Sequence, residues 1–432
     1  MNKRVCMFLF NPFTNDARVL RECTALAEAG YEVDLYALKN HDLQNLPNRE
    51  IRKEGFHVIR VSDVLPEPFN GLMKIGKKIT EFVLKNFFTK IISCLIFLFL
   101  LIKIPIFTLI VGILFLCSSN KKIKISLDRA YSILLLTLSG FKKNYDIYHA
   151  NDLNTLPQAV ISAKLFRNKK LVYDSHEIQT SRTGYNSPFI EVIEKFLIKF
   201  IDVFIHENHT RAKYIEEQYG IYPEVIHNYP FISVQENDKA IDLHEQLNIP
   251  KDEPILLYQG GIQPGRGLEK IIEAVPMINK GIVVFIGDGK SKPTLLEMVK
   301  ENQLEERVKF ISKVPVEELL DYTRNAYLGF QVLNNTNFNH YSASSNKLFE
   351  YIMSGVPVIA CSFPEIQKIV ESENIGICVD SHEAKSIAEG VNALLANPKM
   401  RNEMSSNCVQ AREKYNWDVE KKHFISIYQN LA

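Results

Sequence analysis

Two segments in the second half of the chain combine glycines or small polar residues with a cation, a combination suited to anion binding. Residues 258–267 have the pattern of a strand, a glycine-rich loop carrying Arg266 and then a helix. Residues 344–350 place two serines, an asparagine and Lys347 at the predicted start of another helix. Glycines let a backbone approach a phosphate closely, and a helix start offers N–H groups at the positive end of its dipole. Together the segments predict a site for an anion such as a diphosphate.

Glu350 extends this predicted site by one helical turn, because it lies on roughly the same face as Asn346 and Lys347. A carboxylate repels phosphate, so its natural partner there is a hydroxyl group such as that of a ribose. Each segment also has a purely structural interpretation. Arg266 could be a surface arginine after a tight turn, and a serine could cap the helix while Lys347 is a solvated charge.

Several other kinds of site are excluded by motif. No GxGxxG follows the first predicted strand, and residues 287–291 lack a P-loop's first glycine, whose position holds Val284. No GxSxG nucleophile elbow occurs, and no Asp-x-Asp pair is present to hold a metal on a nucleotide diphosphate. We therefore expect no cofactor and no metal.

Strand-like and helix-like stretches alternate through both halves of the chain, which predicts parallel, doubly wound α/β sheets. The predicted strands are 4–10, 32–38, 57–62, 146–150, 170–174, 203–207, 224–228, 254–259, 282–286, 308–311, 328–332, 357–361 and 376–379. We expect two Rossmann-like domains, 1–232 and 254–415, joined by a linker at 233–253 and followed by a crossover helix at 416–432 that returns to the first domain. The default ligand site of such a pair is the cleft between them.

The order and spacing of further motifs give the chain a resemblance to a known family. The matching stretches are residues 15–22, 148–157, 173–177, 286–289, 314–315, 346–351, 355–359 and 415–417. In this order the chain resembles the GT-B glycosyltransferases, specifically the GT4-like (group 1) family that uses nucleotide-diphosphate sugars. The resemblance implies an α/β GT-B fold, two Rossmann-like domains facing across a cleft, and a retaining, metal-independent sugar transfer.

The resemblance also implies which residues bind the two substrates, with the donor held by the C-terminal domain and the acceptor by the N-terminal domain. Arg266 and Lys347 would neutralise the donor diphosphate, and Glu350 would hold the ribose. The donor-binding candidates are Gly260, Gly261, Arg266, Gly287, Val314, Pro315, Ser345, Asn346, Lys347, Leu348 and Glu350. The acceptor-side candidates are Asn11, Thr14, Asn15 and Asn151.

A histidine next to a carboxylate at the end of a predicted strand, His176 with Glu177, could position or deprotonate an acceptor hydroxyl. His176 could equally be a structural histidine that bonds a loop carbonyl. Asp16 and Asp152 are comparable catalytic candidates, and the sequence does not rank the four.

Three positions depart from the family pattern. Ser342 stands where the family often has the earlier of two glutamates, and Gly261 stands where it often has an arginine. Asn151 replaces the second histidine of a His-x-His-Asp stretch. These changes affect the expected sugar contacts and catalytic detail more than the fold.

Residues 91–117 are the compositional outlier, because 22 of these 27 positions are apolar. As one helix they would extend ~40 Å, beyond the ~30 Å hydrocarbon core of a bilayer. Lys103 and Pro105 near the middle disfavour a straight span, and lysines flank both ends. We expect the insertion at 72–126 to form a re-entrant hairpin or interfacial helix pair that docks the protein on the cytoplasmic face of the membrane. A buried helix pair is the alternative.

The whole-chain composition indicates a globular protein with one local basic segment. The chain has 432 residues, 46% of them hydrophobic, and a formal net charge of +1, so no global attraction to nucleic acid is expected. Ten Lys or Arg and only two Asp or Glu fall within residues 72–130, which leaves the remainder mildly acidic. The seven scattered cysteines contain no CxxC pair, and no signal-peptide core precedes residue 11, so we expect a reducing, cytoplasmic environment.

These features predict a glycosyltransferase that moves a sugar from a nucleotide-diphosphate sugar to a membrane-embedded, lipid-linked acceptor in polysaccharide or glycolipid assembly. One alternative is a catalytically silent nucleotide- or glycolipid-binding scaffold, which the Ser342 and Asn151 departures motivate. Another is a GT-B-like sugar-nucleotide epimerase, which has no need of the membrane segment. The sequence predicts neither the base of the donor nor the oligomeric state.

Overall fold

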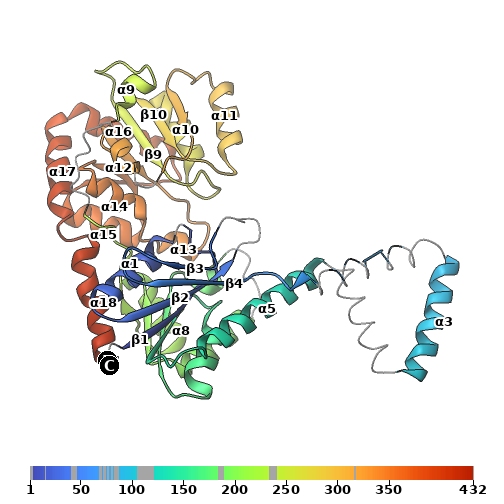
Figure 1. Cartoon of the computed structure of the whole chain (residues 1–432). Helices are drawn as coiled ribbons and strands as arrows, with labels where there is room; N and C mark the ends of the chain where they lie inside the picture. The colour runs from blue at the N-terminus through green and yellow to red at the C-terminus, as the bar shows by residue number, and fades with distance from the viewer. Residues whose placement is uncertain are drawn as a thin grey trace. The chain divides into compact units, whose positions relative to one another are not determined.

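The fold was analysed in a computed structural model of the chain (Figure 1). The structure describes residues 3–431 apart from 15, 40–45, 68–70, 72–73, 75–76, 79–80, 82–86, 105–120, 183–188, 233–240 and 316–317.

The first sheet has eight strands in the order β3-β4-β2-β1-β5-β6-β7-β8. Their bounds are Arg4–Phe8 (β1), Glu32–Lys39 (β2), Arg49–Ile51 (β3), His57–Ser62 (β4), Ile147–Asn151 (β5), Lys170–Ser175 (β6), Val203–His206 (β7) and Glu224–Val225 (β8). The order reverses at β1, as in a doubly wound sheet. The expectation of an all-parallel sheet was wrong at β3, which pairs antiparallel with β4 because the connection between them is too short for a crossover.

The second sheet has six strands in the order β11-β10-β9-β12-β13-β14, and the strand pairs are parallel as predicted. Their bounds are Ile255–Gln259 (β9), Ile282–Ile286 (β10), Val308–Ile311 (β11), Leu328–Gln331 (β12), Val358–Cys361 (β13) and Gly376–Val379 (β14). Strands β9 and β10 are buried along their whole length, which explains their continuous apolar sequences. In the order of the chain, strands β1 to β8 precede the predicted linker and strands β9 to β14 follow it. The predicted domain bounds themselves stay a prediction.

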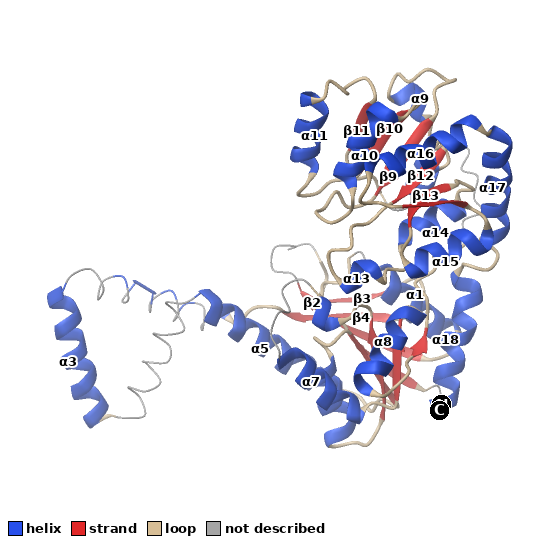
Figure 2. Cartoon of the chain, turned by 180° about the vertical axis from the view of Figure 1, so that it is seen from behind, coloured by secondary structure: helices blue, strands red, loops and turns tan. Residues whose placement is uncertain are grey.

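Helices connect these strands (Figure 2). Up to β8 they are α1 (Ala17–Glu28), α3 (Phe87–Lys103), α5 (Lys121–Gly140), α6 (Leu156–Val160), α7 (Phe189–Leu197) and α8 (His209–Tyr219). Beyond β8 they are α9 (Leu243–Gln246), α10 (Leu268–Ala274), α11 (Lys292–Glu301), α12 (Leu319–Thr323), α13 (Phe338–Tyr341), α14 (Asn346–Met353), α15 (Pro364–Glu373), α16 (Ala384–Ala396), α17 (Pro398–Ala411) and α18 (Trp417–Leu431). Sequence analysis did not predict β3, α13, α15 or α17.

Close contacts divide the chain into two compact units. Unit 1 comprises residues 1–173 and 199–202, and unit 2 comprises residues 174–198 and 203–432. Unit 2 therefore contains the whole second sheet together with β7, β8, α7 and α8.

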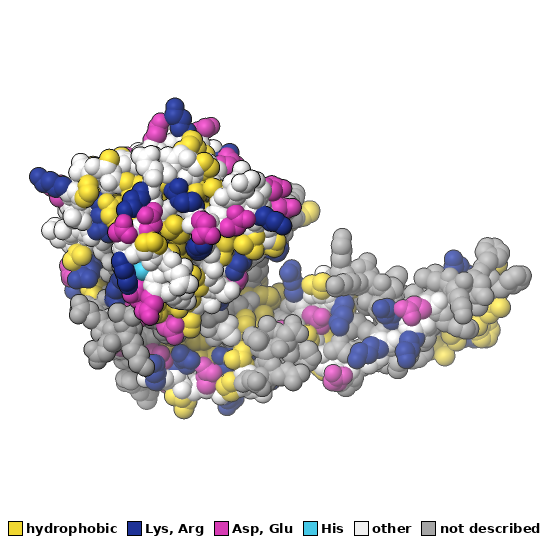
Figure 3. Space-filling view, turned by 90° about the horizontal axis from the view of Figure 1, so that it is seen from above, with side chains coloured by type: hydrophobic (Ala, Val, Ile, Leu, Met, Phe, Trp, Pro, Cys, Tyr) yellow, Lys and Arg dark blue, Asp and Glu magenta, His cyan; other side chains and the backbone are white. Residues whose placement is uncertain are grey.

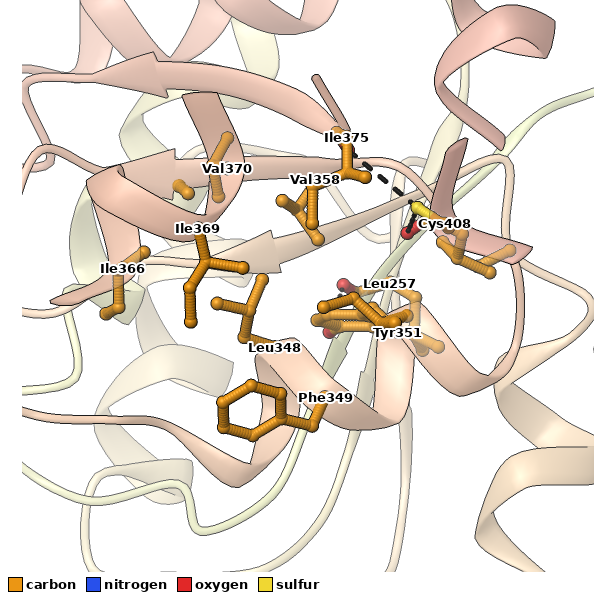
Figure 4. Packing of buried hydrophobic residues seen from close by; sticks show 14 of the residues in the cluster. Leu257, Leu348, Phe349, Tyr351, Val358, Ile366, Ile369, Val370, Ile375 and Cys408 are labelled. Atoms are coloured by element: carbon orange, nitrogen blue, oxygen red, sulfur yellow. Dashed lines mark hydrogen bonds between the residues drawn. The ribbon is translucent and has the colours of Figure 1, made fainter. Parts of the chain in front are cut away.

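The helix α14, which carries several predicted donor-binding residues, is anchored in a hydrophobic core of unit 2 (Figure 4). Leu348, Phe349 and Tyr351 point into this core, and the Tyr351 hydroxyl donates to the carbonyl of Leu257 at 2.9 Å. Because this inner face is fixed by packing, the start of α14 at Asn346 has a fixed position relative to strand β9.

The predicted membrane insertion is only partly covered by the described residues. Helix α3 includes residues 91–103 of the apolar segment, whereas residues 105–117 lie outside the described ranges. Among the described residues, no helix has the length and apolar content needed to cross a membrane. Several apolar side chains of α3 are exposed, namely Ile91, Ile92, Leu95, Ile96 and Phe99.

On the face of the molecule drawn in Figure 3, Lys and Arg side chains are interspersed with Asp and Glu side chains. Neither positive nor negative side chains therefore dominate among those coloured on that face.

Candidate functional site

The candidate anion site begins where β9 and β10 end, at two glycines in left-handed backbone conformations. Gly260 has φ +116° and Gly287 has φ +148°. A Cβ on Gly287 would lie 2.0 Å from the Gly260 carbonyl oxygen, so no other residue fits there. A Cβ on Gly260 would lie 3.5 Å from Cδ of Lys347, which places the lysine stem along this turn. The glycines therefore let the two strand ends approach each other closely and place the end of β9 against Lys347.

Lys347 is a buried cation, with only 7% of its surface exposed. Burial, reinforced by the nearby positive charge of Arg266, lowers the pKa of Lys347 to about 7. Its Nζ lies 5.1 Å from the centre of the Tyr258 ring, a cation–π contact that offsets part of the desolvation. The structural alternative, in which Lys347 is a solvated charge, therefore does not hold.

Neither Arg266 nor Lys347 forms an ion pair with a carboxylate within the described part of the chain. The hydroxyl of Ser344, just before α14, is buried and has no hydrogen-bond partner among the described residues. Buried polar groups normally have partners, because each unsatisfied group costs free energy. Two neighbouring cations and an unsatisfied hydroxyl before α14 are the features that the predicted anion site requires.

Glu350 lies deeper in the same site and is held by side chains from two other elements. Its Oε2 accepts a hydrogen bond from Nε2 of Gln259 at 2.7 Å, and Oε1 of Gln259 accepts one from the Thr323 hydroxyl at 2.7 Å. Burial raises the pKa of Glu350, although Gln259 and Lys347 oppose the shift. These two hydrogen bonds fix the orientation of the Glu350 carboxyl group.

The remaining donor-binding candidates occupy different environments. Val314 is half-buried and Pro315 is exposed, both shortly after β11, and Gly261 is exposed beside Gly260. Ser345 precedes α14 but makes no side-chain cap, and the exposed Asn346 accepts a hydrogen bond from Asn228 at 3.0 Å. The Leu348 side chain packs in the core (Figure 4), so only its backbone could contact a ligand.

His176 has a carboxylate neighbour other than the one that the sequence suggested. Its Nε2 lies 3.4 Å from Oδ2 of Asp174, which is fully buried. Glu177 instead pairs with Arg182 at 3.3 Å and is half-buried. Asp174, rather than Glu177, is thus the carboxylate that lies beside the imidazole ring.

The loop that carries His176 is tied to the segment before α14 by Arg211 of α8. The Arg211 guanidinium donates to the carbonyls of His176 at 2.7 Å and Asn339 at 3.0 Å, and to the Ser342 hydroxyl at 3.1 Å. Asn339 in turn exchanges hydrogen bonds with the backbone of Ile178. All of these residues belong to unit 2. Ser342 therefore has a structural role as an acceptor for arginine.

The candidates in unit 1 make hydrogen bonds that stabilise local structure. Asp16 caps α1 by accepting from the N–H of Val19 at 3.2 Å, and its other oxygen accepts from Asn11 at 2.9 Å. Asn151 is buried and donates to the Phe8 carbonyl at 3.0 Å. Asp152 has a left-handed backbone with φ +63°, Thr14 is exposed, and Asn15 lies outside the described residues.

Sequence reasoning missed Gln259, Asp174, Arg211 and His340. His340 lies against the glycine loop, since a Cβ on Gly265 would be 2.8 Å from its Cε1. Burial and the neighbouring charge of Arg266 lower its pKa. Gln259 and Asp174 stood at buried strand ends, where a polar residue in an apolar run was an available signal, whereas nothing local marked Arg211 or His340.

Part of the chain matches a family model and several curated proteins. Residues 239–410 match the family model described as glycosyl transferases group 1. D-inositol 3-phosphate glycosyltransferase of a Nocardioides species is 22% identical over 258 residues, which are 55% of each chain. The enzyme of that name from Xylanimonas cellulosilytica is 24% identical over 191 residues, covering 43% of this chain and 44% of that protein. The chain thus spans about half the length of the curated relatives it matches.

Solved structures match over the whole chain. Sucrose-phosphate synthase from Thermosynechococcus elongatus has a TM-score of 0.68 at 17% identity, covering 100% of this chain and 99% of that chain. Anabaena HepE in complex with UDP-glucose has a TM-score of 0.67 at 14% identity, covering 99% of each chain. At such identities the likeness shows the fold, which is the α/β GT-B fold.

The matched region contains most of the candidate site. Residues 239–410, which match the model of glycosyl transferases group 1, include the glycine turn, Arg266, Lys347 and Glu350.

Proposed function

We propose that the protein transfers a sugar from a nucleotide-diphosphate sugar to a lipid-linked acceptor at the cytoplasmic face of a membrane. The main support for a nucleotide-diphosphate donor is the buried Lys347 beside Arg266. Neither cation forms an ion pair with a carboxylate in the described chain. HepE in complex with UDP-glucose supports the nucleotide-sugar assignment.

The reaction needs the site to stabilise the departing diphosphate. When the bond between the sugar and the diphosphate breaks, the leaving oxygen gains negative charge, and preorganised cations lower the energy of that state. Lys347 and Arg266 supply this charge without a metal, and the glycine turn at Gly260 and Gly287 lets the backbone approach the phosphates. Glu350, oriented by Gln259, accepts hydrogen bonds from ribose hydroxyls.

His176 is the best-placed group for the acceptor hydroxyl. Asp174 beside it favours the imidazole orientation that a proton acceptor or positioning group requires. We propose transfer with retention of anomeric configuration, as the family resemblance implies. NMR of the product, which distinguishes the two anomers, tests this directly.

The lipid acceptor is inferred from the insertion at 72–126. Its described part presents exposed apolar side chains on α3, and lysines flank the segment on both sides. A glycosyltransferase has most need of a membrane dock when its acceptor is held in the bilayer.

A donor screen tests the first half of this proposal. Purified protein is incubated with UDP-, GDP- and ADP-sugars, while thermal shift reports binding and nucleoside-diphosphate release reports turnover. One nucleotide sugar should stabilise the protein and be consumed when a lipid fraction is added. Stabilisation without any release would instead favour a catalytically silent scaffold, and epimerisation of the free donor would favour an epimerase.

Substitutions on α3 test the membrane half. Leu95→Ser/Phe99→Ser should reduce vesicle binding and transfer to lipid acceptor, while the donor-induced thermal shift stays intact. The matched control is Leu165→Ser/Phe166→Ser, which removes two exposed apolar side chains from another site in unit 1. Undiminished transfer to lipid by the α3 variant would contradict the proposed dock.

A further inference from the structure

Helix α7 presents an apolar stripe to solvent. The exposed fractions are 70% for Phe189, 64% for Val192, 45% for Ile193 and 57% for Phe196. These residues are spaced i, i+3, i+4 and i+7, so they share one face of the helix. Helices at the surface of a soluble domain normally turn such a face toward the core.

The opposite face of α7 buries a charged residue. Glu194 is buried, and its Oε2 accepts a hydrogen bond from the Tyr219 hydroxyl of α8 at 3.0 Å. Leu197 packs on the same inner side. The hydrogen bond between the buried Glu194 and Tyr219 fixes the rotation of α7 about its axis. The apolar face therefore points toward solvent, whereas in an ordinary surface helix it points toward the core.

We infer that this α7 stripe inserts into the interface of an anionic lipid bilayer, as a contact separate from the insertion at 72–126. The inference rests on the membrane docking in the proposed function and adds a second anchor to it. A single weak anchor binds membranes only marginally, whereas two anchors bind stably.

Charge around the stripe favours lipid as its occupant. The exposed charged residues from 189 to 200 are Glu191, Lys195 and Lys199, a net positive set. Lysines beside an apolar stripe can extend their stems along it and place their ammonium groups among anionic headgroups.

The size of the stripe disfavours a second copy of the chain as the occupant. Nine residues of helix are about 14 Å long, and a helix is about 10 Å wide. A stable protein interface buries about 800 Å² on each partner, several times the face that α7 offers. An interfacial helix has no such requirement when another anchor shares the binding.

The placement of α7 gives the contact a functional consequence. In the order of the chain, α7 lies between β6 and β7, and the end of β6 leads into His176. Docking of α7 would therefore hold the membrane near the segment that carries the proposed acceptor-side histidine, where a lipid-linked acceptor must be presented.

A depth-sensitive fluorescence experiment tests the inference on the full chain. The protein has one tryptophan, Trp417, which is buried and serves as a constant background. The Phe189→Trp variant is mixed with vesicles of phosphatidylcholine and phosphatidylglycerol that contain brominated phosphatidylcholine. We expect a blue shift and quenching of the added fluorescence, both weaker with phosphatidylcholine alone.

A second variant measures binding without a probe. Val192→Ser/Ile193→Ser should weaken partitioning into the same vesicles about tenfold. The matched control is Leu296→Ser/Val419→Ser, which removes two exposed apolar side chains from α11 and α18 and should leave partitioning unchanged. Donor-induced thermal shift confirms that each variant is folded.

The possible failures are distinguishable. Vesicle binding by the wild type without quenching in Phe189→Trp would overturn the α7 contact and leave the insertion as the dock. A blue shift that depends on protein concentration without vesicles would overturn it in favour of self-association. No vesicle binding by the wild type would overturn both this inference and the proposed membrane docking.

Discussion

Asp16 in unit 1 and Lys347 in unit 2 differ in how far the described residues already satisfy their charges. In unit 1, both carboxylate oxygens of Asp16 accept hydrogen bonds, one in the cap of α1 and one from Asn11. Asn151 is intermediate, because its amide group donates to the Phe8 carbonyl while its buried Oδ1 has no hydrogen-bond partner among the described residues. In unit 2, Lys347 is buried without a carboxylate partner in the described chain, and its pKa is lowered as a result. All of these residues looked equally functional in the sequence.

The difference separates structural polar groups from groups that await a ligand. A satisfied buried group contributes to stability, so its loss destabilises the fold. An uncompensated buried cation costs stability in the free protein and is kept for what it binds. The comparison therefore predicts that substitutions in the two regions affect different measured quantities.

The largest effect is expected from Lys347→Met. Loss of the cation at the leaving diphosphate should lower turnover by about a hundredfold or more. The same change should raise the melting temperature of the donor-free protein by roughly 2–4 °C, because a buried charge is removed. Nucleoside-diphosphate release and thermal denaturation measure the two quantities. A destabilised variant with normal turnover would place Lys347 among the structural residues.

The pH dependence of donor binding is the next test. Since the pKa of Lys347 in the free protein is about 7, the lysine is neutral above that pH and must take up a proton when the diphosphate binds. The donor Kd should therefore rise by up to about tenfold per pH unit above 7. Calorimetry in two buffers with different ionisation enthalpies should show proton uptake at pH 8. The Lys347→Arg variant, which stays charged, should show none.

The same shift has a defined effect on stability. The folded-state pKa of about 7 lies below the ordinary value of 10.5, so between these pH values the unfolded chain holds more protons than the folded one. The contribution of Lys347 to unfolding free energy therefore increases with rising pH across this window. The stability gap between Lys347→Met and the wild type should narrow accordingly.

Local sequence patterns were sufficient for much of the fold and for part of the site. The strands of the second sheet were predicted from continuous apolar runs such as 255–259 and 282–286. Strands that are buried on both faces have such runs in place of an alternating pattern. The glycine loop and the start of α14 were predicted because their function depends on residue type within a few positions. Strand β3 was not predicted, because its three mostly exposed residues are too few to show an alternating hydrophobic pattern.

Partners brought together from distant parts of the chain could not be predicted. Arg211 contacts residues 35 positions before it and 131 positions after it, and no sequence pattern links them. The identity of the carboxylate beside His176 likewise depended on which way neighbouring side chains point along a strand. Adjacent residues alternate faces, so Asp174, two positions earlier, shares a side with His176 where Glu177 does not.

Arg211→Lys tests whether this long-range clamp positions His176. Lysine keeps the charge but loses the planar fork that reaches the His176 carbonyl and Ser342 together. We expect kcat to fall about five- to tenfold with little change in the KM for donor, because Arg211 bonds the His176 carbonyl and Ser342 and not the residues proposed to bind the diphosphate. Arg182→Lys, at the exposed partner of Glu177, is the control. A KM change equal to the kcat change would indicate a general distortion of unit 2.

The smallest effect is expected from Asp16→Ala, which tests the other side of the comparison. The substitution removes the α1 cap and the partner of Asn11, so it should cost about 1 kcal/mol of unfolding free energy. Turnover per folded molecule should be preserved, because both carboxylate oxygens are already engaged in the helix cap and its loop. Denaturant unfolding gives the stability, and nucleoside-diphosphate release at a temperature where the variant is fully folded gives the activity. Asp16→Ser is the matched control, since a serine cap should recover most of the stability. A hundredfold loss of turnover in both variants would show that a satisfied polar group can still act on substrate, and the distinction between the two regions would then fail for unit 1.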